Sequence, residues 1–110
     1  MNTLPANDQM LDEVGRLFGT LGDASRLRIL RILLGAAAPL SQGAIAEAAG
    51  LSQPNASKHL AQLAQAGLVL REPRGSAVLF SPVTPLVQEV CGLVCQHVSR
   101  RIQSVYASLD

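Results

Sequence analysis

The sequence has few aromatic residues and no tryptophan. Phe18, Phe80 and Tyr106 are its aromatic residues in a chain of 110. A core made from this sequence must therefore be aliphatic, and because leucine and alanine favour helices we expect a mainly α fold. The length fits a single domain, which we place at residues 1–110.

Long apolar stretches and a secretory signal are also lacking. The longest apolar run, residues 32–40, is far shorter than the roughly 18 residues that a membrane span needs. The first ten residues have neither a basic start nor an apolar segment. Two cysteines are too few for a disulfide framework. We therefore expect a cytoplasmic protein with no membrane partner.

Motifs of catalysis are missing as well. The chain has no glycine-rich phosphate loop, no paired carboxylates in a suitable context and no Ser-His-acid arrangement. Its two cysteines are spaced Cys91-x-x-x-Cys95, which differs from the Cys-x-x-Cys spacing of thiol oxidoreductases. The net charge of +1 favours no particular partner. We expect no enzyme and no obligatory cofactor.

Four segments before Gly67 have apolar residues at helical spacing. Residues that favour N-cap positions precede the last three of them, namely Asp23, Ser41 and Ser52. The predicted helices are residues 8–20, 24–35, 43–49 and 53–66.

The pattern changes after Gly67. Residues 68–70 and 77–80 are short β-type runs, and Glu72–Gly75 between them are typical of a hairpin turn. Thr84 and Pro85 favour the start of a long final helix at about 84–108. The first seven residues are expected to be flexible. Apolar residues of the final helix advance by threes and fours, at positions 87, 91, 94, 98, 102, 105 and 109.

Two short helices joined by residues 50–52 and followed by a β-hairpin indicate a winged helix–turn–helix. The stretches LGDASRLRILRILL (21–34) and LSQPNASKHLAQLAQAGLVLREPRG (51–75) resemble the ArsR/SmtB-type winged-helix repressors. The resemblance covers about residues 10–106. It implies a dimeric transcriptional repressor of α+β class, mainly α, with a two-stranded wing and a C-terminal dimerisation helix. The wing departs from the family because residues 77–80 lack the usual tyrosines.

The fourth helix would then be the recognition helix. The amino-terminal half of such a helix enters the major groove of double-stranded DNA, where Gln and Asn can bond adenine and Lys and Ser can bond guanine or phosphate. His59 flanks the apolar stripe, so it has either a phosphate or base contact or a structural role. The predicted DNA-binding residues, including two arginines of the wing, are Gln53, Asn55, Ser57, Lys58, His59, Arg71 and Arg74.

A repressor of this size is expected to bind a palindromic operator as a twofold homodimer. The final helix has two apolar sides and therefore needs two partners, its own domain and another chain. The first helix is its natural companion, as in the resembled family. One side is the apolar seam, formed by Val87, Cys91, Val94, Val98, Ile102 and Val105. The other is a flank formed by Leu86, Val90 and Leu93.

Cys91 and Cys95 both lie on the apolar seam, and two interpretations remain open. They either fill space as small buried residues or act as a sensor. Thiolates four residues apart on a helix can chelate a soft metal or metalloid ion, or react with an oxidant or persulfide. The third helix offers no ligand, and the final helix lacks the Asp, His and Glu set of zinc sites. Because the net charge is near neutral, an interaction module that has lost DNA binding is a further alternative.

Overall fold

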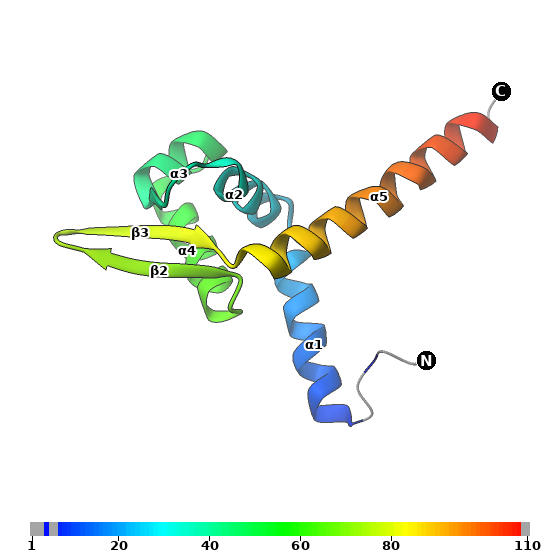
Figure 1. Cartoon of the computed structure of the whole chain (residues 1–110), viewed down its shortest axis with the longest axis horizontal. Coiled ribbons are helices and arrows are strands. Elements are labelled where there is room, and N and C mark those ends of the chain that lie inside the picture. The colour runs from blue at the N-terminus through cyan, green and yellow to red at the C-terminus, as the bar shows by residue number, and fades with distance from the viewer. Residues whose placement is uncertain (1–3, 5–6, 109–110) are drawn as a thin grey trace.

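A computed structural model of the chain describes Leu4 and residues 7–108 (Figure 1). It confirms the mainly α winged helix–turn–helix. The flexible segment expected at residues 1–7 and the seam position 109 lie largely outside the described residues. The elements in chain order are α1 (Asp8–Leu21), α2 (Ala24–Gly35), β1 (Leu40–Ser41), α3 (Gln42–Ala49), α4 (Gln53–Gln65), β2 (Val69–Arg74), β3 (Ala77–Pro82) and α5 (Thr84–Ser108).

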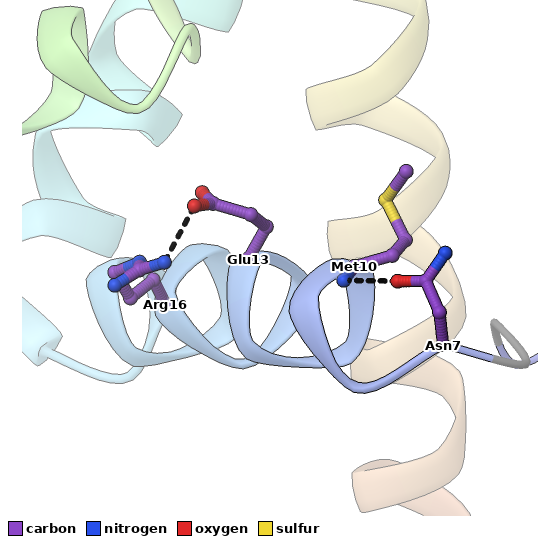
Figure 2. Close-up of polar contacts among 4 residues, drawn as sticks. All are labelled: Asn7, Met10, Glu13 and Arg16. Atoms are coloured by element: carbon purple, nitrogen blue, oxygen red, sulfur yellow. Dashed lines mark hydrogen bonds and ion pairs between the residues drawn. The ribbon is translucent and has the colours of Figure 1, made fainter.

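Side-chain caps begin the first four helices. The Asn7 side chain accepts a hydrogen bond from the backbone N–H of Met10 at 2.7 Å, a cap that the sequence analysis did not identify (Figure 2). In the same helix Glu13 and Arg16 form an exposed ion pair. Each predicted cap is confirmed because it accepts a backbone N–H in the first turn of its helix. These caps are Asp23, Ser41 and Ser52.

The wing belongs to a three-stranded antiparallel sheet, one strand more than predicted, in the order β1-β3-β2. β1 pairs with β3 through Leu40 and Ser41, and a strand of two residues has no alternation by which a sequence could reveal it. The predicted turn at Glu72–Gly75 is also wrong, because β2 continues to Arg74. The strand includes Pro73, which an edge strand tolerates. The turn is Gly75-Ser76, with Gly75 at a φ of 59° that favours glycine.

The core lies between α2, α3, α4 and the sheet, and the start of α5 packs against it. It is aliphatic as predicted, with Phe80 its aromatic member. Non-directional burial of these side chains supplies the main stabilisation of the fold. The core residues are Leu21, Ile29, Leu30, Leu33, Ile45, Ala49, Leu60, Leu63, Leu68, Val69, Phe80 and Val87.

α1 and α5 project from this core in different directions (Figure 1). The radius of gyration is 16.3 Å, above the value of about 13 Å expected for a compact domain of this size. α5 has 25 residues, yet no helix in the described part of the chain combines the length and hydropathy that crossing a bilayer requires. Large apolar side chains of the two helices are exposed, among them Met10, Leu11, Phe18, Leu86, Leu93, Val94, Val98 and Ile102.

Candidate nucleic-acid interface

The connection between α3 and α4 sets the angle of the helix–turn–helix. Gly50 ends α3 in the left-handed conformation at a φ of 67°. The next N–H, that of Leu51, returns to the carbonyl of Ala46 at 2.9 Å and closes the helix. Ser52 then caps α4, whose first turn contains Pro54. The turn therefore fixes where α4 starts relative to α3.

α4 has one buried and one exposed face. Ala56, Leu60 and Leu63 are buried, as the predicted apolar stripe requires. The structure brings five of the predicted DNA-binding residues together on the remaining surface of this helix, where His59 is half-buried and the others are exposed. We call this set the recognition surface, and it consists of Gln53, Asn55, Ser57, Lys58 and His59.

The two wing residues lie on a separate element. Arg71 and Arg74 are exposed on β2, which runs away from α4 toward the tip of the hairpin (Figure 1). Arg74 forms an ion pair with Glu72 at 3.2 Å, and both side chains are more than half exposed. Exposed pairs of this kind contribute about 1 kcal/mol or less, so Arg74 can exchange Glu72 for a phosphate.

Gln53 is oriented by a contact from α3. The Nε2 of Gln42 donates to the Oε1 of Gln53 at 3.1 Å. A Cβ added at Gly43 would lie 3.2 Å from the Nε2 of Gln53, so a larger residue there would shift the end of this side chain by a few tenths of an ångström. An amide oxygen has a second lone pair and its nitrogen has two hydrogens, so Gln53 keeps the groups that can bond a base. The sequence analysis missed Gln42, which no local pattern marks.

His59 is in contact with Arg26 of α2. The Nη1 of Arg26 lies 3.4 Å from the Nδ1 of His59 and donates to the Oε1 of Gln62 at 2.6 Å. Because a guanidinium only donates, a hydrogen bond between these two atoms requires Nδ1 as the acceptor, which places the ring proton of a neutral His59 on Nε2. The contact with Arg26 would then use Nδ1 and leave Nε2 for the predicted contact with DNA, so the two roles predicted as alternatives for His59 do not exclude each other. Sequence reasoning did not identify Arg26 or Gln62 as part of the site.

Asp23 lies next to this cluster as the N-cap of α2. Its carboxylate accepts the backbone N–H of Arg26 at 3.1 Å. That hydrogen bond lowers the pKa of Asp23 below its ordinary value of 3.8, and the charge of the Arg26 side chain acts in the same direction. The Asp23 side chain is therefore an anion at neutral pH, and it lies next to the Arg26 guanidinium, which contacts α4.

The two cysteines of α5 have different surroundings. Cys91 is half-buried against the core, and Cys95 is an exposed free thiol one turn further. Burial raises the pKa of Cys91, with a smaller contribution from Cys95 in the same direction. No group of three or more His, Cys, Asp or Glu side chains within the described residues could hold a metal ion. Two cysteines from one chain could supply two thiolates, which would suit a soft ion of low coordination number or an ion shared with a second chain.

Comparisons with known proteins point to DNA-binding regulators. A helix–turn–helix domain family matches residues 21–72, from the end of α1 into the wing. The crystal structure of a possible transcriptional regulatory protein (fragment 1–100) from Mycobacterium bovis is 30% identical, with a TM-score of 0.73, over 84% of this chain and 97% of that chain. No curated protein matched the sequence.

Two further solved structures share the fold. One is the homodimeric winged helix–turn–helix DNA-binding domain of Mb0332 from Mycobacterium bovis, a possible ArsR-family transcriptional regulator. It is 26% identical over 94% of this chain and 95% of that chain, with a TM-score of 0.79. The other is reduced HlyU from Vibrio cholerae, 26% identical over 81% of this chain and 92% of that chain, with a TM-score of 0.66.

Proposed function

This chain belongs to the ArsR/SmtB-type family of winged helix–turn–helix transcriptional regulators, and on that premise we propose that it is a dimeric, sequence-specific DNA-binding repressor. The observation that carries the proposal is the division of α4 into a buried apolar face and an exposed polar face. The polar residues lie toward the amino-terminal end of the helix, the end that enters a major groove. With operator DNA as its partner, the protein would act in the cytoplasm.

The homodimer is supported by the apolar surface of α1 and α5. Side chains such as Phe18 and Val98 are exposed on these helices although a monomer gains nothing from exposing them. The Mb0332 domain, which has the same fold, is homodimeric. A second copy would cover both helices and present two recognition helices to the half-sites of a palindrome, about 34 Å apart.

The first test measures operator binding against salt by fluorescence anisotropy, with duplexes from the chain's own upstream region. Each phosphate that the protein neutralises contributes a slope of about −0.9 in log K against log salt. Lys58→Ala and Arg74→Ala should each flatten the slope by about one unit per protomer, because each variant leaves one phosphate without its cation. Arg101→Ala, which removes the same charge from the far part of α5, is the matched control.

Two results of this experiment would contradict the assignments. A slope that neither Lys58→Ala nor Arg74→Ala changes would remove both residues from the interface. A wild-type protein that binds no duplex would favour the interaction module instead.

We further propose that a thiol-reactive signal releases the repressor through Cys91 and Cys95. Cys91 lies where α5 leaves the core, and Cys95 lies one turn along the helix toward its exposed apolar part. A soft ion that replaces the two thiol protons would join these positions. The packing of α5 against its partner, and with it the spacing of the recognition helices, would change. A disulfide within the helix fits less well, since it needs Cβ atoms about 3.5–4.5 Å apart whereas residues four apart have about 5–6 Å.

The double variant Cys91→Ser, Cys95→Ser tests this switch. Arsenite, mercury, cadmium, and a persulfide or peroxide are titrated in turn into the complex with DNA. At least one should release the wild type, with a coupling of about 1–3 kcal/mol between the two sites. The double variant should bind DNA normally and not respond, because serine oxygen is a poor ligand for soft ions. If no reagent releases the wild type, the cysteines are packing residues.

A further inference from the structure

Among the described residues, Arg26 is the side chain of α2 that forms hydrogen bonds to both α1 and α4. Its Nε donates to the backbone carbonyl of Thr20 in the last turn of α1 at 2.6 Å. Its Nη1 donates to the Oε1 of Gln62 on α4 at 2.6 Å and lies 3.4 Å from the Nδ1 of His59. Neighbouring residues of α2, Ile29 and Leu30, are buried in the core. The guanidinium, which belongs to a helix anchored in the core, therefore connects α1 with the recognition helix α4.

The hydrogen bonds to Thr20 and Gln62 are directional, so they constrain the orientation of α1 relative to α4. The carbonyl of Thr20 lies at the carboxyl end of α1, where carbonyl groups lack partners within the helix and the helix dipole favours a cation. A guanidinium presents its donors in a rigid planar fork, so the Nε and Nη1 contacts fix the end of α1 relative to Gln62. An ammonium at the same place has its three donors on a single nitrogen at the end of a flexible chain, so it lacks the fixed spacing of the fork.

The buried stripe of Ala56, Leu60 and Leu63 sets which face of α4 is turned to the core. The hydrophobic effect is non-directional, so directional contacts can refine the rotation of α4 about its own axis. Gln62 and His59 lie three residues apart and share one side of the helix. Hydrogen bonds to both of them orient that side toward Arg26, and the orientation of the remaining recognition surface follows.

We propose that Arg26 is a positioning residue for operator recognition, which couples the carboxyl end of α1 to the rotation of α4 and to the Nε2–H tautomer of His59. The inference rests on the proposed DNA-binding function. Since α1 is also a proposed dimer helix, Arg26 provides a hydrogen-bonded connection by which a change in the dimer reaches the recognition surface.

The variants Arg26→Lys, Gln62→Met and their combination test the coupling, with Arg28→Lys on the exposed side of the same helix as the matched control. Anisotropy gives the affinity for the operator and for a scrambled duplex, and sedimentation gives the dimer fraction. Each single variant should lower the ratio of the two affinities about tenfold. The double variant should lower it no further than the stronger single variant, because both changes break one link.

A merely structural role predicts a different result. Loss of folded protein lowers both affinities by the same factor and leaves their ratio unchanged. An unchanged ratio in Arg26→Lys and Gln62→Met, with a selective wild type, would overturn the inference and leave the proposed function standing. A wild type that does not discriminate between the duplexes would overturn the proposed function, and the inference would fall with it.

A second measurement requires no DNA. Nitrogen-15 NMR of the imidazole rings distinguishes the two neutral tautomers. The wild type should show His59 with its proton on Nε2, and Arg26→Lys should show a mixture of tautomers. Ring signals of His59 that are identical in the two proteins would overturn the coupling between Arg26 and His59.

Discussion

The central part of the molecule and its two projecting helices use the same residue types in opposite ways. In the central part, Ile29, Ile45 and Leu63 are fully buried at 0% exposure. On the projecting helices Phe18 is 56% and Leu93 is 68% exposed. Composition alone does not separate these residues. The difference lies in whether the chain itself supplies a complementary surface, and for most of α1 and α5 it does not.

The two regions contribute to two different free energies, that of folding and that of association, which a stability measurement on the dimer would combine. Burial of apolar surface stabilises by about 25 cal/mol per Å² wherever it occurs. In the central part that gain belongs to the folding of one chain, whereas on α1 and α5 it belongs to association and therefore depends on protein concentration. Substitutions in the two regions should affect different measurements.

The largest effect is expected from Val98→Glu, which places a charge on the exposed apolar part of α5. In a dimer this charge would be buried without a partner, at a cost of several kcal/mol for each protomer. Sedimentation should show monomers that have lost operator binding, while circular dichroism shows a folded central part. Gln96→Glu adds the same charge two residues away, on the opposite side of the helix, and should leave the dimer intact. A stable, DNA-competent Val98→Glu dimer would show that another surface forms the interface.

A smaller effect is expected from a pair of identical truncations, Leu63→Ala and Leu93→Ala. In the monomeric Val98→Glu background, Leu63→Ala should lower the free energy of unfolding by about 2–5 kcal/mol, because it leaves a cavity in the core. Leu93→Ala should change it by less than about 0.5 kcal/mol, since Leu93 is exposed. Urea denaturation measures both. If both variants lost the same free energy of unfolding, Leu93 would contribute to the folding of one chain as Leu63 does, and the two regions would not differ in this respect.

The helices and the caps Asp23, Ser41 and Ser52 could be predicted because their signals are local, although the Asn7 cap of α1 was missed. Apolar residues at helical spacing and a capping residue at the start, such as Asp23 or Ser52, lie within a few positions of one another. The same holds for the apolar residues of α5. The seven predicted DNA-binding residues and the two sensor cysteines stay predictions, which the experiments above address.

What the sequence could not supply are contacts between distant positions. Gln42 and Gln53 are 11 residues apart, and Arg26 and Gln62 are 36 apart. β1 is recognisable only by its pairing with β3. The different surroundings of Cys91 and Cys95 depend on where α5 leaves the core, which no spacing within the helix reveals.

The smallest expected effect concerns the junction of the two regions, where Asp23 caps α2 directly after α1 ends. Since the folded-state pKa of Asp23 lies below its unfolded value, the unfolded chain binds the proton more tightly. The stabilisation is therefore complete at neutral pH and is lost as the pH falls from about 5 through the lowered folded pKa.

Asp23→Asn isolates this titration, because asparagine is as good an N-cap as aspartate but has no proton to bind in this range. Urea denaturation of the wild type and the variant, both in the monomeric Val98→Glu background, should give stabilities that converge as the pH falls from 6 toward 3, since only the wild type loses the contribution of Asp23. The backbone N–H of Arg26 is the main cause of the lowered pKa, so the effect should persist in Arg26→Lys. Parallel curves for aspartate and asparagine would mean that the carboxylate contributes to the cap by its shape alone, and that the junction between core and projecting helix carries no electrostatic stabilisation at this residue.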